Sequence, residues 1–193
     1  DKISEYAMEH GLSGFEFACG IPGSLGGAIV MNAGAYGGEM SEVLSEVKLL
    51  GSDGSIKWKS VSELELSYRK SNILANSEIV LSARLKLRPG DKEKIRAEIE
   101  DLNNRRQEKQ PLEYPSAGST FKRPEGYFAG KLIDDAGLRG FRLGGAAVSQ
   151  KHCGFVINYD NASSDDIKNL IEYVKSNVYE KFGVKLECEV RMI

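Results

Sequence analysis

The sequence predicts a mixed α and β protein built from two segments. The run "EIVLSARLKLR" (78–88) alternates apolar and polar residues with the period of a half-buried strand. Two stretches later in the chain repeat apolar residues at helical spacing, and "RPGDKEK" (88–94) separates the two regimes by an abrupt rise in charge. With 193 residues, 41% of them hydrophobic, the chain can bury one large core or two small ones. We therefore expect domains at 1–90 and 91–193.

Composition excludes several classes of function. The formal net charge is −2, so no basic excess points to nucleic acid or to an anionic membrane surface. No apolar run is long enough for a membrane span, and no secretory signal is evident. The three cysteines form no CxxC pair, which favours a reduced, cytoplasmic setting, and with only two histidines they argue against structural zinc.

The first segment begins with a predicted helix at 4–10, with Ser4 as N-cap and Gly11 after its end. The glycine-rich stretch 20–38 predicts a loop that leads into a short helix of small residues. From Glu42 the chain alternates as a strand, turns at "SDG" (52–54) and returns through Ile56 and Trp58. The strand that follows places five apolar residues on its buried face: Ile79, Leu81, Ala83, Leu85 and Leu87.

The second segment begins with a helix that Asp91 caps and Pro111 stops, with Ile95, Ile99 and Leu102 on its apolar face. A second helix, at 165–182, starts with a capping box of Ser163 and Asp166 and ends at Gly183. It should bury Ile167, Leu170, Ile171, Val174 and Val178. The alternating end "VKLECEVRMI" (184–193) predicts a strand whose inward residues are Val184, Leu186, Cys188, Val190 and Met192.

Four features could take part in chemistry, but residue types alone do not decide between a structural and a functional role for any of them. The glycine loop fits neither GxGxxG nor GxxxxGK[ST], so it either turns the chain or lets a ligand approach the backbone. Arg69 is either a solvated cation or the bidentate partner of a carboxylate. Ser119, in "PLEYPSAGSTFKRP" (111–124), is a turn residue or a donor to a very strong base such as a carbanion, since no GxSxG elbow surrounds it. Glu187 and Glu189 share one strand face, which is solvent-facing or part of a site.

Taken together, five blocks resemble one family, in order along the chain. They are "CGIPGSLGGAIVMNAGAYGGEM", "LSYRKSN", "RRQEKQPLEYPSAGSTFKRP", "GFRLGGAAVSQKHCGFVIN" and "LECEVR". The sequence is similar to the UDP-N-acetylenolpyruvoylglucosamine reductases, also called UDP-N-acetylmuramate dehydrogenases. The short connection after Tyr68 resembles the subtype without an inserted tyrosine loop.

The resemblance implies the second half of a vanillyl-alcohol-oxidase-like FAD-binding domain followed by an α+β substrate-binding domain. It implies an oxidoreductase of the cytoplasm that makes UDP-N-acetylmuramate for peptidoglycan. NADPH would reduce FAD, and hydride would then pass to C3 of the enolpyruvyl group of UDP-N-acetylglucosamine enolpyruvate. No nucleic acid or membrane partner is implied, and we expect a monomer.

The resemblance also assigns residues. Ser119 matches the family's proton donor to C2, Arg69 the arginine that holds the substrate carboxylate, and Glu189 the catalytic glutamate of the final motif, where Cys188 replaces the family's proline. The expected FAD contacts are Ile21, Pro22, Gly23, Gly26, Gly27, Val30, Asn32 and Gly34. The expected substrate contacts are Tyr68, Lys122, Arg123 and His152.

One departure from the family concerns the start of the chain. It has no initiator methionine and enters directly at a predicted helix, so we expect the N-terminal flavin subdomain of the family to be absent. The alternative function is therefore a truncated fragment that acts only as a UDP-sugar-binding module and is inactive without that subdomain.

Overall fold

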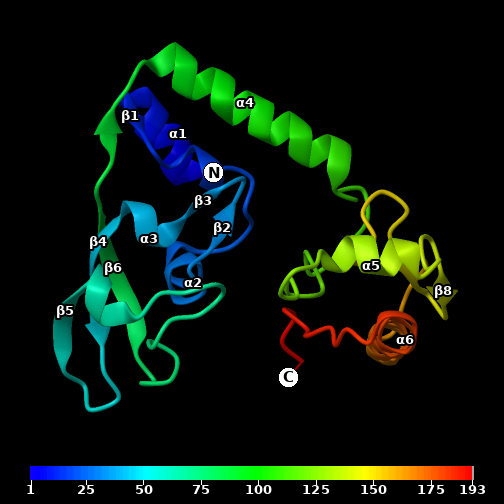
Figure 1. The fold of residues 1–193 in the computed structure, drawn as a ribbon. Coiled ribbons are helices and arrows are strands. Elements are labelled where there is room, and N and C mark those ends of the chain that lie inside the picture. Colours follow the sequence, from blue (N-terminus) through cyan, green and yellow to red (C-terminus); the bar gives the residue numbers. More distant parts are fainter. Residues whose placement is uncertain (193) are drawn as a thin grey trace. The chain divides into compact units, whose positions relative to one another are not determined.

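A computed structural model describes residues 1–192 and divides into two compact units, Asp1–Arg106 and Gln107–Ile193 (Figure 1). Each unit has its own hydrophobic core. The expected mixture of helices and strands is confirmed. No helix within residues 1–192 is both long and apolar enough to cross a membrane.

The first unit contains an antiparallel sheet of strand order β5-β4-β6, drawn along one side of the unit in Figure 1. β4 (Leu44–Leu50) pairs with β5 (Ile56–Ser60) through the predicted hairpin, where Asp53 Oδ1 accepts from Ser55 N at 2.9 Å. The core of this unit is formed by residues of the sheet and of the helices and loops packed on it. They include Ile29, Met40, Val47, Leu49, Leu64 and Ile73.

The strand β6 (Ile79–Leu85) corrects one prediction. Its pairing with β4 shifts between Lys48 and Leu49, so Leu81 is the extra residue of a β-bulge. Because a bulge reverses the facing of the residues beyond it, Val80 packs on the core while Ile79 and Leu81 are exposed. Ala83, Leu85 and Leu87 pack on the core as predicted.

The segments before the sheet are short. α1 (Lys2–Glu9) begins earlier than predicted, with Asp1 at the N-cap, and Ser4 instead lies inside the helix, where its Oγ donates to Phe15 O at 3.3 Å. Gly11 follows the helix with φ +65°, as expected of a residue after a helix end. The remaining elements before the sheet are β1 (Leu12–Ser13), η1 (Glu16–Ala18), α2 (Leu25–Val30), β2 (Gly34–Ala35), β3 (Gly38–Glu39) and α3 (Met40–Val43). The predicted glycine loop with a short helix is thus confirmed as α2 and its flanks.

Between β5 and β6 the chain forms η2 (Val61–Leu64). After β6, β7 (Arg88–Pro89) pairs with β1. The predicted long helix is α4 (Lys92–Lys109), and Asp91 Oδ1 accepts from the amides of Glu93 and Lys94 at its start. The first compact unit extends through Arg106, so most of α4 belongs to it, whereas the sequence predicts a boundary between residues 90 and 91. The functional assignment of the two domains stays a prediction.

The second unit combines α5 (Ala129–Asp135), an antiparallel sheet and α6 (Ser164–Phe182). The sheet has the order β10-β9-β8, from β8 (Arg142–Leu143), β9 (Ala146–Val148) and β10 (Val156–Asn158). One face of the sheet packs on α6 through Ala146, Val148 and Val156, while Ala147, Phe155 and Ile157 form a small cluster with Tyr114. The predicted capping box is present, since Ser163 and Asp166 exchange hydrogen bonds, and Gly183 ends α6 with φ +68°.

The predicted C-terminal strand is wrong for most of its length. One bridge forms, Phe121 with Cys188, flanked by Lys122 N to Glu187 O and Glu189 N to Thr120 O, both 2.9 Å. The facing segment lies between Gly118, with φ +83°, and Pro124, so little straight backbone is available to extend the ladder. Leu186 and Cys188 pack inward as predicted, but Met192 is 49% exposed. Ile193 lies outside the described residues.

Candidate active site

Arg69 lies at the tip of a tight turn in the first unit. Ser67 and Lys70 exchange two backbone hydrogen bonds, of 3.0 and 3.1 Å, across Tyr68 and Arg69. Arg69 has φ +54°, an uncommon conformation for a residue with a side chain. Its Nη2 donates to Gly34 O at 3.2 Å, and its guanidinium lies 5.0 Å from the Tyr68 ring centroid. Arg69 and Tyr68, both of which the resemblance assigns to the substrate, therefore lie side by side on one turn.

Asn32 and Ser71 attach this turn to the glycine loop. Asn32 is fully buried; its Nδ2 donates to Ser67 O at 3.3 Å and its Oδ1 accepts from Ser41 N at 2.9 Å. Ser71 Oγ donates to Val30 O at 2.7 Å. Three of the expected FAD contacts, Val30, Asn32 and Gly34, thus bond directly to the loop that carries Arg69. The Asn32 side chain itself is engaged within the fold.

The other expected FAD contacts lie around the start of α2. Pro22, Gly23 and Gly27 are exposed, and Gly27 N donates to the Oγ of Ser24, the N-cap, at 3.1 Å. Gly23 has φ +130°, and a Cβ built there would meet no atom within 4 Å. The backbone is accessible there, which fits a flat cofactor lying against it. Packing does not require a glycine at position 26, because a Cβ there would make an ordinary contact of 3.6 Å with the Val80 side chain.

The carboxylate of Glu39 interacts electrostatically with Arg69, and Glu39 pairs with Gly34, whose carbonyl accepts from Arg69. Ser41 Oγ donates to Glu39 Oε1, and hydrogen bonds from Ser41 and Asn32, helped by the charge of Arg69, lower the pKa of Glu39. Glu39 therefore remains ionised at neutral pH. It partly balances the Arg69 charge near Gly34, a role that sequence reasoning missed, because nothing in "GGEM" distinguishes Glu39 from a surface glutamate.

Ser119 is exposed on the second unit, and the hydrogen bonds of the next residue, Thr120, fix its backbone. Its Oγ lies 3.4 Å from Phe121 O, at the limit of a hydrogen bond. The next residue, Thr120, is buried: its amide donates to Gly154 O at 2.8 Å and its Oγ1 accepts from Val156 N at 2.9 Å. Thr120 O also accepts from Glu189 N. The Ser119 backbone is thus placed by bonds to β10 and to the C-terminal segment, while its hydroxyl is accessible.

His152 lies beside the same glycine as Ser119. A Cβ built on Gly154 would come within 2.9 Å of His152 Cε1 and 3.7 Å of Ser119 Oγ, so the imidazole and the hydroxyl border one space. His152 Nδ1 accepts from Gly154 N at 3.0 Å, which places the ring proton on Nε2. Burial of the ring, with a smaller contribution from the Arg139 charge, lowers the pKa of His152, so the imidazole is neutral at pH 7.

The remaining predicted residues of this unit divide into two groups. Glu189 is half-buried and its backbone is bonded to Thr120, next to Ser119. Lys122 instead forms an ion pair with the other glutamate, with 3.1 Å between its Nζ and Glu187 Oε2. The Arg123 guanidinium lies 4.0 Å from the ring centroid of Phe128. The second unit therefore assembles Ser119, His152 and Glu189, and the first assembles Arg69, Tyr68 and the glycine loop.

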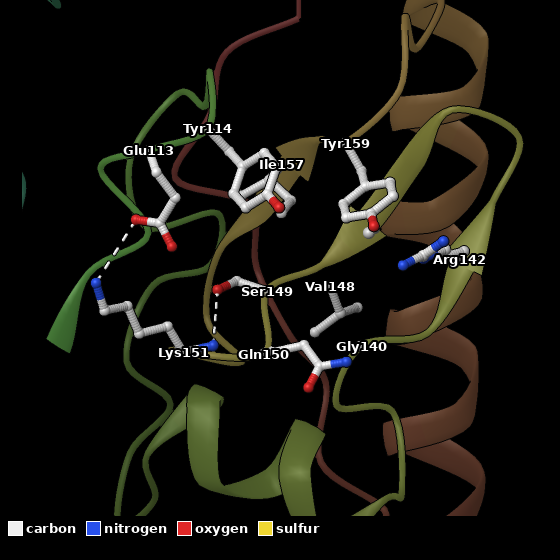
Figure 2. A pocket seen from close by; sticks show the side chains of 11 residues that line it. Glu113, Tyr114, Gly140, Arg142, Val148, Ser149, Gln150, Lys151, Ile157 and Tyr159 are labelled. Carbon is white, nitrogen blue, oxygen red and sulfur yellow. Dashed lines mark hydrogen bonds and ion pairs between the residues drawn. The ribbon is translucent and has the colours of Figure 1, made fainter.

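A cavity of about 470 Å³ in the second unit is lined by none of the predicted residues (Figure 2). Ala147, Val148 and Ile157 contribute apolar surface, and the stacked rings of Tyr114 and Tyr159, 5.4 Å apart, lie along one side. The Arg142 guanidinium lies 3.7 Å from the Tyr159 centroid, and Lys151 pairs with Glu113 at 3.6 Å. Sequence reasoning had no signal for this cavity, because its lining comes from short elements and loops without periodicity.

Residues 1–192 contain neither a metal-binding cluster nor a disulfide bond. No group of three or more His, Cys, Asp and Glu side chains there is arranged to hold a metal ion. The three cysteines are free thiols, and burial raises the pKa of each of them. Thiolate chemistry is therefore disfavoured at neutral pH.

Comparisons with known proteins agree with the resemblance. Residues 110–193 match the family "UDP-N-acetylenolpyruvoylglucosamine reductase, C-terminal domain", and residues 1–60 match "FAD binding domain". The chain thus carries part of a flavin-binding domain.

Individual relatives extend the match to nearly the whole chain. The UDP-N-acetylenolpyruvoylglucosamine reductase of Clostridium botulinum (strain Alaska E43) is 58% identical over 99% of this chain, and that of Clostridium perfringens (strain SM101) is 54% identical over the same share. The chain spans 63% of the length of each. The crystal structure of the Thermus caldophilus UDP-N-acetylenolpyruvylglucosamine reductase matches 98% of this chain and 68% of its own, with a TM-score of 0.87 and 37% identity. The chain therefore belongs to the UDP-N-acetylenolpyruvoylglucosamine reductase family.

Proposed function

We propose that the chain takes part in the NADPH-driven, FAD-dependent reduction of UDP-N-acetylglucosamine enolpyruvate to UDP-N-acetylmuramate. The observation that carries this proposal is the family membership, supported by a structural match that covers 98% of the chain. FAD, when bound, supplies the hydride that NADPH provides and that C3 of the enolpyruvyl group receives. The reaction belongs to peptidoglycan precursor synthesis in the cytoplasm, and the protein acts as a monomer.

Arg69 binds the substrate carboxylate in this proposal. When hydride adds to C3, negative charge develops at C2 and spreads onto the neighbouring carboxylate as an enolate. A guanidinium can donate two parallel hydrogen bonds to that carboxylate and so stabilises the charge that develops in the transition state. The turn at Ser67–Lys70 and the bond to Gly34 O support this role, because they restrict where the guanidinium lies.

Ser119 donates the proton that C2 receives. A hydroxyl is a weak acid, but a carbanion is a base strong enough to take its proton, so the donor needs no lowered pKa. The exposed position of Ser119 on a backbone held by Thr120 supports this role. Glu189 is the third catalytic residue, and its proximity to Thr120 places its backbone beside that of Ser119.

Tyr68, Lys122, Arg123 and His152 contact the substrate in this proposal. Cationic side chains suit a diphosphate, and the neutral His152, with its proton on Nε2, offers a hydrogen-bond donor beside Ser119. The eight glycine-loop residues named above contact FAD, chiefly through their backbone at the exposed Pro22, Gly23 and Gly27.

The second candidate function is a UDP-sugar-binding module without reductase activity. It is favoured by the separate core of the second unit and by its cavity with stacked tyrosines and cations. This candidate requires binding of the nucleotide sugar without any flavin.

A flavin titration, combined with a turnover assay and a thermal-shift assay, distinguishes the two functions. The chain is mixed with FAD, and the absorbance and fluorescence of the flavin are followed, next to a chimera that adds the part of the Clostridium botulinum relative with no counterpart here. Saturable FAD binding and NADPH-dependent consumption of the enolpyruvyl substrate by either protein support the reductase. A thermal shift of the chain with UDP-N-acetylglucosamine, with no flavin binding or turnover in either protein, supports the binding module and contradicts the reductase.

A further inference from the structure

Two arginines from distant elements meet the same small hairpin in the first unit. The hairpin consists of β2 and β3, Gly34–Glu39, with Tyr36 and Gly37 at its tip. Arg69 Nη2 donates to Gly34 O at its base. The Arg106 guanidinium, from α4, lies 5.3 Å from the centroid of the Tyr36 ring. The hairpin thus connects α4 to the loop that carries Arg69.

Arg106 is held in place on both sides. It is 91% buried, with 9% of its surface exposed, and its Nη2 donates to Cys19 O at 3.1 Å. Gly20 makes this approach possible, since a Cβ there would come within 2.8 Å of Arg106 Nε and 3.1 Å of Asn103 Oδ1. Burial of a guanidinium whose Nε has no hydrogen-bond partner among the described residues is costly. The contact with the Tyr36 ring offsets part of this cost.

The hairpin has little freedom to rearrange on its own. A Cβ on Gly34 would meet Gly38 O at 2.7 Å, and a Cβ on Gly38 would meet the Phe17 ring at 2.8 Å, so both strands are closely packed. Tyr36 has φ +54°, which residues with a side chain seldom adopt. The cation–π contact with Arg106 favours that conformation, because it holds the ring over a desolvated guanidinium. A shift of the tip would therefore carry Gly34 O, and with it the Arg69 guanidinium.

We propose that Arg106 and Tyr36 are positioning residues for Arg69: they fix the β2–β3 hairpin so that Gly34 O orients the Arg69 guanidinium. This inference rests on the proposed role of Arg69 for its catalytic consequence, but its structural part stands without any flavin or substrate. Neither residue touches the reacting atoms in this proposal. Both act through the hairpin.

The test compares Arg106→Gln with Arg105→Gln in the chain itself. Arg105 is the adjacent residue of α4, about half exposed and paired with Asp101, so its substitution removes a cation from the same turn without touching the hairpin. The side-chain ¹H–¹⁵N signals of Arg69, assigned by their loss in Arg69→Lys, report whether its guanidinium is restrained. We expect wild type and Arg105→Gln to share these signals, and Arg106→Gln to shift or broaden them. Unchanged Arg69 signals in a folded Arg106→Gln protein would overturn the proposal.

Tyr36→Ala provides a second route if Arg106→Gln does not fold. Tyr36 is 43% exposed and is not among the residues of the core, so removal of its ring spares the core. We expect the same change in the Arg69 signals, while Tyr36→Phe, which keeps the ring, retains the wild-type spectrum. Unchanged signals in Tyr36→Ala contradict the proposal even if Arg106→Gln cannot be studied.

The catalytic consequence is measured separately, in whichever of the chain or the chimera turns over substrate. A misplaced guanidinium should lower kcat/KM for the enolpyruvyl substrate by about tenfold or more and leave the reduction of FAD by NADPH unchanged. If the Arg69 signals respond and neither protein has activity, the proposed function fails while the positioning network stands. If activity is present and Arg106→Gln equals Arg105→Gln in kcat/KM, the positioning role for the reaction is wrong.

Discussion

The side chain of Asn32 donates a hydrogen bond from Nδ2 to the carbonyl oxygen of Ser67, with 3.3 Å between the two atoms. This bond joins the glycine loop to the turn that carries Tyr68 and Arg69, across 35 positions of sequence. Asn32 is fully buried and has φ +41°, a conformation that asparagine adopts more readily than most residues. One residue thus couples the proposed cofactor loop to the proposed carboxylate-binding arginine.

Asn32→Asp should loosen the Arg69 turn. Aspartate keeps an acceptor for Ser41 N but replaces the donor to Ser67 O by a second oxygen, so the part-buried hydrogen bond becomes a repulsion between two oxygen atoms. Hydrogen exchange of the 67–70 amides, measured by mass spectrometry, should become at least about tenfold faster, as expected for a loss of roughly 1.4 kcal/mol. The exposed Asn76→Asp is the matched control and should leave exchange at 67–70 unchanged. Equal exchange in the two variants would show that the bond does not hold the turn.

Ser119→Ala should separate the two halves of the proposed reaction. Loss of the hydroxyl removes the proton donor to C2, so reduction of the enolpyruvyl substrate should fall by about 10²-fold or more. Reduction of FAD by NADPH needs no proton from Ser119 and should continue at the wild-type rate. Stopped-flow measurement of both half-reactions, in the active form of the protein, distinguishes these effects. Ser116→Ala, in the same loop, is the control, and equal damage to both half-reactions by Ser119→Ala would exclude the proton-donor role.

Val80→Ser and Leu81→Ser should differ in a way that the alternation of the sequence does not predict. Because the β-bulge turns Val80 toward the core and leaves Leu81 46% exposed, Val80→Ser should lower the free energy of unfolding by about 1–3 kcal/mol. Leu81→Ser should change it by less than about 0.5 kcal/mol. Urea unfolding followed by circular dichroism makes the comparison. The reverse ranking would mean that β6 pairs with β4 without the bulge.

His152 should make the second unit less stable in mild acid. Its pKa is lowered in the folded protein by burial, so the unfolded chain takes up a proton near pH 6.5 that the folded protein resists. The stabilisation by neutral His152 is therefore complete above about pH 6.5 and is lost as the pH falls from there through the lower pKa of the folded state. His152→Gln keeps an acceptor for Gly154 N and does not titrate, so its unfolding free energy should decrease less between pH 7 and pH 5. His10→Gln controls for the exchange of an imidazole for an amide, and parallel pH profiles of wild type and His152→Gln would contradict the prediction.

Local signals were sufficient for the elements whose stability is local. The caps of α4 and α6 involve residues at most three positions apart, Asp91 with Lys94 and Ser163 with Asp166, and both were predicted from sequence. The hairpin at 52–54 depends on its own turn residues and was also predicted. The bulge in β6 was not, because it follows from pairing with β4, and the C-terminal strand failed because its partner segment is short.

The sequence by itself determined the mixed fold, the limits of its long helices and the family, together with the motif residues that the family assigns. These depend on residue type, period and spacing, which can be read directly from the sequence. Only the tertiary structure placed Asn32 under Ser67, Ser119 beside His152 at Gly154, and Arg106 against Tyr36. Each of these pairs is separated by more than thirty residues and rests on a single hydrogen bond, a missing Cβ or a ring contact. Such contacts have no period in the sequence, because what selects them is the packing of segments that meet only after the chain has folded.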